Sequence, residues 1–198
     1  MQWKNLVWVG AGLLALAPSA VLATGQFSVH GGVGYNKALN DGYPDGSLGI
    51  QGGVLYNAQP NFGLGLEVGY LGLGSYSASY EGVNGKVDGD ISISQIPVNG
   101  IFQYSFHPSG RVQPMLMGGV GLYSSRIETK LSGATQGFSA STSTTSTASD
   151  FGFNAGAGVK LGRASQAVRF GGDARFHLVM TEGESTKMLN VMGRVYFN

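Results

Sequence analysis

The feature that most constrains this chain is a two-residue alternation of apolar and other side chains. In the stretch FGFNAGAGVKLG, Phe151 to Gly162, every larger apolar residue and alanine falls on one parity, and glycine, Asn154 and Lys160 fall on the other. This is the period of a β-strand, and the helix that would follow a nucleotide-binding glycine loop is missing from the pattern. Eight segments of the chain show the alternation, namely residues 26–35, 47–57, 62–76, 90–106, 112–125, 151–161, 167–180 and 188–197.

The charged residues within these segments distinguish a membrane barrel from a soluble sandwich. The six charged residues within the bodies of these segments all lie on the parity opposite the apolar residues: Glu67, Lys160, Arg169, Asp173, Arg175 and Arg194. A charge that faces lipid costs about 2–4 kcal/mol at the bilayer midplane, so an apolar face without charges is typical of a lipid-facing wall. The sequence therefore predicts an all-β fold, an eight-stranded antiparallel up-and-down transmembrane β-barrel.

The breaks between the segments alternate in length. Short breaks lie at 57–61, 107–111 and 162–166, and longer ones at 36–46, 77–89 and 126–149. Outer-membrane barrels combine tight periplasmic turns with longer extracellular loops, so we predict that the longer breaks are extracellular. The last of them contains SASTSTTSTAS, which has almost no apolar group, and we expect a mobile loop or an extended hairpin there.

The N-terminus resembles a cleaved secretory signal in its layout. Lys4 precedes an apolar run from Leu6 to Ala17, and a Val21-x-Ala23 ending follows, which predicts a signal peptide over 1–23 and a barrel domain over 24–198. No later segment is apolar for 18 residues in a row, so no transmembrane helix is expected.

Without Lys4 the chain has 11 basic and 11 acidic residues, and this balance of charge disfavours nucleic acid as a partner. It has no cysteine, so it has neither disulfides nor thiolate metal sites.

The inward-facing polar residues form the first candidate site. We predict a barrel-interior polar network of Glu67, Lys160, Arg169, Asp173, Arg175, His177 and Arg194. Eight strands leave an interior just wide enough for side chains, and buried charges need partners, so this network should plug the barrel. Inward glycines such as Gly156 and Gly158 would make room for the long side chains. The alternative is a gate whose ion pairs can exchange.

Leu71 and Leu73 form a second candidate site, because they fall on the inward parity near the predicted outer rim. They could line an apolar vestibule. The alternative is a β-bulge after Gly69 that turns both side chains outward, since bulges are common at barrel rims.

The end of the chain, LNVMGRVYFN, has alternate apolar residues that lead to Phe197, one residue before the last. With VQPMLMGGVGLYSS and VRFGGDARFHLVM, it resembles the small eight-stranded outer-membrane barrels of Gram-negative bacteria, the OmpX/OmpA-type family, over residues 24–198. The resemblance implies an outer-membrane location and contact with outer-membrane lipid and lipopolysaccharide. It also implies recognition of the C-terminal strand, ending at Phe197, by the barrel-insertion machinery. We expect a monomer.

The resemblance leaves the function open among three hypotheses. Some similar barrels process lipid A with a Ser/His/acid set, but the strands beside His177 offer no inward serine at its height, and His30 lies in mid-barrel. We therefore predict no catalytic, cofactor-binding or metal-binding residues. The leading hypothesis is a non-enzymatic barrel that contributes to envelope integrity or surface interactions through its loops. The alternatives are a narrow OmpW-like channel for small hydrophobic or polar solutes and a lipid A-modifying enzyme.

Overall fold

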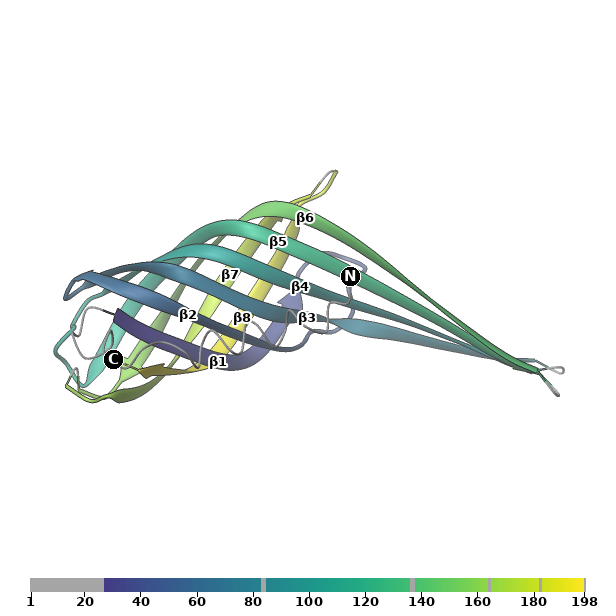
Figure 1. Ribbon diagram of the computed structural model, residues 1–198, viewed down its shortest axis with the longest axis horizontal. Helices are drawn as coiled ribbons and strands as arrows, with labels where there is room; N and C mark the ends of the chain where they lie inside the picture. The colour runs from purple at the N-terminus through teal and green to yellow at the C-terminus, as the bar shows by residue number, and fades with distance from the viewer. Residues whose placement is uncertain (1–26, 83–84, 136–137, 164, 182, 198) are drawn as a thin grey trace.

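The computed structural model describes residues 27–82, 85–135, 138–163, 165–181 and 183–197. The predicted signal peptide lies outside them. The described residues form eight strands in one closed barrel (Figure 1). The strands are β1 (Phe27–Ala38), β2 (Ser47–Gln59), β3 (Phe62–Gly82), β4 (Gly85–Ser105), β5 (Val112–Thr135), β6 (Phe138–Leu161), β7 (Val168–Met180) and β8 (Thr186–Phe197). The predicted eight-stranded, up-and-down barrel is confirmed.

Antiparallel pairing between neighbours along the chain builds the barrel, and pairing of β8 with β1 closes it. At the seam, Val29 lies opposite Phe197 and Ala38 lies opposite Met188. A closed ring satisfies backbone N–H and C=O groups between strands, which a strand in the hydrocarbon core requires because no water is present there. Within the described ranges, no helix is long and apolar enough to cross a bilayer.

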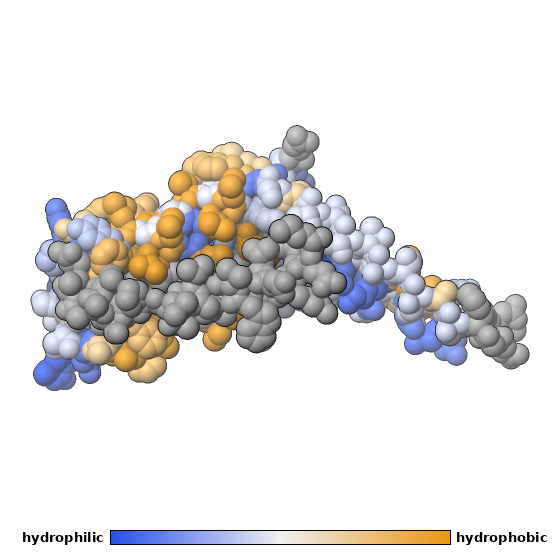
Figure 2. Space-filling view, in the orientation of Figure 1, coloured by the Kyte–Doolittle hydropathy of each residue, from blue (hydrophilic) through white to orange (hydrophobic). Residues whose placement is uncertain are grey.

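The two faces of the barrel wall differ as the alternation predicts. Large apolar side chains cover the outside: Val33, Leu48 and Leu66 are 66%, 74% and 68% exposed, whereas the charged side chain of Glu67 is only 2% exposed. Figure 2 shows this apolar surface on the body of the barrel. Such exposure is unfavourable in water and favourable against lipid, so the wall is suited to a bilayer.

The two ends of the barrel are different. At one end, short turns join β2 to β3, β4 to β5 and β6 to β7, and the pairing of Val29 with Phe197 places the start of β1 and the end of β8 at this end too. At the other end, β3, β4, β5 and β6 continue together as a tapering four-stranded sheet (Figure 1). We call this part the extension: residues 74–82, 85–94, 124–135 and 138–149.

The extension corrects the expected strand limits. β3 and β4 have 21 residues each and β5 and β6 have 24, whereas the other four strands have 12 or 13. Most of 77–89 and 126–149, expected as loops, is therefore strand, and of the two alternatives for 126–149 the extended hairpin is the one observed. The reason is cross-strand pairing, which runs without a register shift from Val112 opposite Leu161 to Thr135 opposite Phe138. A segment rich in serine and threonine resembles a loop when it is considered alone. Threonine is β-branched, however, and suits a strand when a neighbouring strand is present to pair with it.

The narrow interior explains glycine at Gly156. A Cβ atom at this position would lie 2.2 Å from the carbonyl oxygen of Ala174 and 2.8 Å from Cα and Cγ of Arg175 on the neighbouring strand. These distances are far below van der Waals contact, and the first of them involves backbone, which cannot rotate away. Glycine at this position therefore leaves the space through which the Arg175 side chain passes.

We predict that Gly156→Val lowers the free energy of unfolding by about 1–3 kcal/mol, because inserted carbon forces backbone and side-chain shifts in a packed interior. The measurement is a urea titration of the refolded barrel, read by heat-modifiable gel mobility. Gly133→Val is the matched control, since a Cβ there meets nothing within 4 Å. Equal losses in the two variants would contradict this packing argument.

Candidate functional site

Two carboxylates and two guanidinium groups meet in the centre of the barrel. Glu67 comes from β3, Asp173 and Arg175 from β7, and Arg194 from β8. Arg175 donates from Nη1 to Glu67 Oε1 at 2.8 Å, from Nη2 to Glu67 Oε2 at 3.2 Å and from Nε to Asp173 Oδ1 at 2.8 Å. This arginine therefore links two carboxylates, one on its own strand and one on a distant strand.

Arg194 makes a second link between the same two carboxylates. Its Nη1 donates to Glu67 Oε2 at 2.9 Å, and its Nε donates to Asp173 Oδ2. Its Nη2 donates to Gln51 Oε1 at 2.8 Å, and Nε2 of His30 lies 3.0 Å from Glu67 Oε2. We call Glu67, Asp173, Arg175 and Arg194 the ion cluster.

The ion cluster is balanced in charge and closed to solvent. Two acidic and two basic groups sum to zero, and each of the four side chains is at most 3% exposed. Charges so deeply buried persist only if they are paired and hydrogen-bonded on most sides, as these are. The cluster therefore acts as a cross-brace, by which we mean that its ion pairs connect β3 to β7 and β8 through the lumen.

The other predicted members of the polar network lie outside the ion cluster. Lys160 lies nearer the short turns, with its Nζ 4.5 Å from the ring centre of Tyr196, a cation–π contact. Arg169 donates from Nη1 to Gln113 Oε1 at 2.7 Å. His177 lies on the extension side, where its Nδ1 is 2.9 Å from the hydroxyl of Tyr123.

Sequence reasoning overlooked the two tyrosines that contact Lys160 and His177. Tyr123 and Tyr196 are 0% and 1% exposed, and both occupy the inward parity of their strands. The signal was the parity itself: each tyrosine is flanked by residues that belong to the lipid-facing set, as Tyr123 is by Leu122. Aromatic residues are also common in the girdles on the outside of such barrels, so the residue type alone does not assign a tyrosine to the lumen.

An apolar layer covers the ion cluster on the side of the extension. Leu71 and Leu73 are both 0% exposed, and they pack with Ala38, Tyr123, Val179 and Met188. The register of β3 against β4 does shift, but between Gly72 and Gly74, and Gly74 adopts a φ of +104°. The bulge therefore comes later than the alternative expected, and both leucines stay inside. They fill the mouth of the barrel instead of lining an open vestibule.

The extension carries ion pairs and hydrogen bonds of a different kind, exposed on one of its faces. Ser79 donates to Asp88 Oδ1 at 2.6 Å, and Lys86 Nζ lies 3.0 Å from the same oxygen. The hydrogen bond from Ser79, together with Lys86, holds the pKa of the Asp88 carboxyl below its usual value. The Lys130 ammonium group, 3.1 Å from Glu128, lowers the pKa of that carboxyl in the same way.

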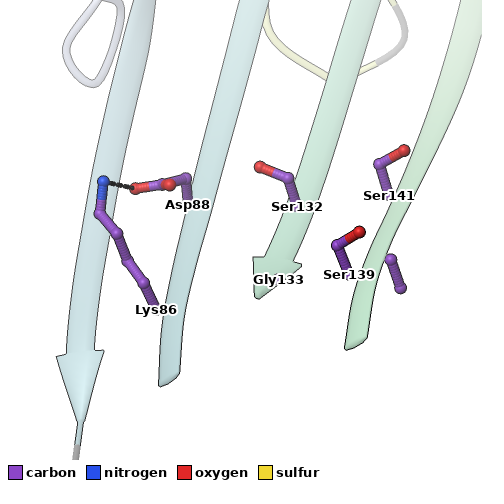
Figure 3. Close-up of a pocket in the computed structure, with 7 residues that line it drawn as sticks. Lys86, Asp88, Ser132, Gly133, Ser139 and Ser141 are labelled. Atoms are coloured by element: carbon purple, nitrogen blue, oxygen red, sulfur yellow. Dashed lines mark ion pairs between the residues drawn. The ribbon is translucent and has the colours of Figure 1, made fainter. Parts of the chain in front are cut away.

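A shallow hollow opens near the tip of the extension (Figure 3). Figure 3 shows the Lys86–Asp88 ion pair on one side and three hydroxyl groups, from Ser132, Ser139 and Ser141, on the other. Hydroxyls without an adjacent base are weak nucleophiles, and the hollow has no histidine in its lining. Among the described residues, no group of three or more His, Asp and Glu side chains is placed to hold a metal ion.

A closed eight-stranded barrel with an apolar exterior and an ion-paired interior defines the class of outer-membrane β-barrel proteins. The sequence agrees, because residues 6–191 match the family model of the outer membrane protein beta-barrel domain, and the chain belongs to that family. It is thus a protein of the Gram-negative outer membrane. A comparison with curated proteins gives no match.

Solved structures of small outer-membrane barrels resemble the fold. Neisserial surface protein A is 14% identical with a TM-score of 0.53, over 87% of this chain and 96% of that chain. The attachment invasion locus protein Ail of Yersinia pestis is 16% identical with a TM-score of 0.40, over 86% and 97%. The N-terminal β-barrel domain of Pseudomonas aeruginosa OprF is 14% identical with a TM-score of 0.41, over 87% and 98%. The likeness to the first of these is a likeness of fold.

We predict that Arg175→Ala lowers the free energy of unfolding by about 3–5 kcal/mol, because it leaves Glu67 and Asp173 buried with one cation fewer. Urea titrations of the protein in lipid vesicles measure the change. Arg126→Ala on the extension is the control, since Arg126 forms a solvent-exposed pair with Glu128, and exposed pairs contribute little. If Arg175→Ala leaves the unfolding midpoint in place, the ion cluster is not the cross-brace described above.

Proposed function

We propose that this protein is a non-enzymatic outer-membrane barrel whose plugged interior holds the extension at the cell surface, where the extension mediates interactions with other surfaces. The length of β3 to β6 carries the proposal. A transmembrane strand needs about 9–11 residues, and these strands have 21 or 24. Roughly half of each strand is therefore in excess of what the bilayer requires.

The position of the extension supports an outward orientation. It lies at the end of the barrel opposite the short turns, and in outer-membrane barrels the tight turns are periplasmic. The extension would then project away from the cell, as a rigid sheet rather than as flexible loops. A sheet that holds its shape loses less conformational entropy when it binds a partner than a loop does.

The filled lumen favours this function over the channel. The ion cluster occupies the centre and the layer around Leu71 and Leu73 occupies the mouth, so two successive layers of buried side chains lie on the axis. Opening a water path would require the arginines to give up paired carboxylates. His177 has a phenol and not a serine as its hydrogen-bond partner, which disfavours the lipid A-modifying enzyme.

We expect no steady current when the refolded protein is inserted in a planar bilayer, because the lumen is filled at two levels. Single-channel recording measures this, and heat-modifiable gel mobility first confirms that the barrel has folded. A reproducible, ion-selective conductance from the inserted protein would replace the proposed function with the channel.

We predict that shortening the extension removes the surface interactions and leaves the barrel intact. The variant lacks residues 76–91 and 127–146, with each hairpin closed by an Asn-Gly turn. Bacteria that express it are compared with bacteria that express the full chain for adherence to cultured epithelial cells, to polystyrene and to one another. Adherence to at least one of the three should fall several-fold at equal surface abundance. No change in any of the three would contradict the proposed function.

A further inference from the structure

The amphipathic pattern of β3, β4 and β5 reverses where the barrel ends and the extension begins. Inside the barrel, Tyr123 and Gln95 point into the lumen. The same parity of β5 continues to Ile127 and Leu131, and that of β4 continues to Ile91, without a register shift between these two strands. In the extension, then, the face that continues the polar lumen becomes apolar, and the face that continues the lipid-facing wall becomes polar.

We call the first of these the apolar face. Its large side chains lie beside one another across three strands and are 40–74% exposed: Tyr76, Tyr80, Val87, Ile91, Ile127 and Leu131. Small or hydroxylated residues complete the face, and Ile93 at its base packs against the apolar layer in the barrel mouth. An exposed and contiguous apolar surface with tyrosines is typical of a protein interface.

The opposite face holds the charges of the extension. Cross-strand pairing puts Glu81, Lys86, Asp88, Asp90, Arg126, Glu128 and Lys130 together on it. Apart from Asp150 at the base, the apolar face in the described part of the extension therefore has no ionisable group other than tyrosine. Charged and apolar side chains are thus separated onto opposite faces of the sheet. A partner that covers the apolar face must itself be apolar and uncharged where it makes contact.

We propose that this cover is the apolar face of a second copy of the protein, carried by a facing membrane. The inference rests on the proposed function and names the partner. Two such faces pack as a β-sandwich, in which two sheets lie about 10 Å apart with their strands nearly aligned. Because the face carries no charge along its length, it meets its own copy without repulsion between like charges.

The size of the apolar face is sufficient for such an interface. Nine residue pairs join the outer parts of β3 and β4, so the extension is about 30 Å long at about 3.3 Å per residue, and its four strands span about 19 Å. Each copy thus contributes about 600 Å², and the pair about 1,200 Å², which reaches the range of specific protein interfaces. A small molecule fits this site less well, because the face is open and ligand sites bury most of the ligand's surface.

A copy in the same membrane cannot supply the cover. Two copies in one membrane would be related by a two-fold axis along the membrane normal, so residues at the same height above the membrane would face each other. At the rim, the apolar face of each sheet is continuous with the inner wall of its own barrel. The second barrel wall would have to stand inside the first barrel. A copy in a facing membrane arrives in the opposite direction, so that the tip of each sheet meets the base of the other and the barrels stay apart. The protein remains a monomer within its own membrane.

The test is aggregation of phosphatidylcholine vesicles that carry the reconstituted protein, followed by turbidity and by energy transfer between two populations with different dyes. Wild-type vesicles should aggregate. Ile91→Asp should lower the rate of aggregation at least tenfold, because each sandwich would bury two unpaired charges. Ser92→Asp is the matched control: it adds the same charge one residue away, on the polar face, and should leave the rate within twofold.

Leu131→Asp repeats the test on another strand, and heat-modifiable mobility verifies that each barrel is folded. The inference is overturned if wild-type vesicles stay dispersed or if Ile91→Asp and Ser92→Asp behave alike. It is also overturned if wild-type vesicles join protein-free vesicles equally well, since the cover would then be lipid. Shortening the extension could abolish adherence to epithelial cells or polystyrene while wild-type vesicles fail to aggregate. That combination would support the proposed function and would reject only the inference that the partner is a second copy.

Discussion

Closure of the hydrogen-bonded ring between β8 and β1 is the constraint on which the rest of this structure depends. A sheet that spans lipid cannot leave backbone groups unpaired, and with eight strands the ring fixes a lumen only as wide as a few side chains. Every inward residue must then fit a set volume. Arg175 and Arg194 fit because positions across from them, such as Gly156, have no side chain at all. The arginines in turn need Glu67 and Asp173, because charge in so narrow a space has no water to solvate it.

The sequence predicts the barrel well because a bilayer makes the pattern unambiguous. Charged residues such as Glu67 and Arg194 can only lie on the lumen side of the wall. The alternate positions of the same strands must then face lipid. The same reasoning selects the members of the interior network but not their partners. That Glu67 meets Arg175, and that His177 instead meets Tyr123, depends on the register and tilt of strands far apart in the sequence. Those quantities are set by how the whole ring closes, which no single segment encodes.

Most of the extension was predicted as loop, with an extended hairpin as the alternative for 126–149, for a related reason. Serine and threonine lack the apolar surface that identifies a strand, so 138–149 resembles a loop when taken alone. Its neighbour β5 supplies the missing stabilisation, because the pairing that begins in the membrane continues outward in the same register. The periodicity was present in the neighbouring strands, where Ile91 and Ile93, and Ile127 and Leu131, alternate with polar residues. This signal could have identified the extension, but with the apolar residues on the opposite parity to that of the barrel.

The change of parity follows from the solvent on each side of the wall. In the membrane, lipid covers the outer face of the sheet and protein fills the inner one, so apolar residues lie outside. Above the membrane, water replaces lipid on the outer face, and charged residues such as Lys86 and Asp88 take that side. The inner face no longer has a barrel wall opposite it, because the other four strands end at the rim. Water alone would favour polar residues there too, as it does on β6, yet Ile91, Ile127 and Leu131 are apolar. Their presence is therefore explained by a cover that the described residues of the chain do not provide.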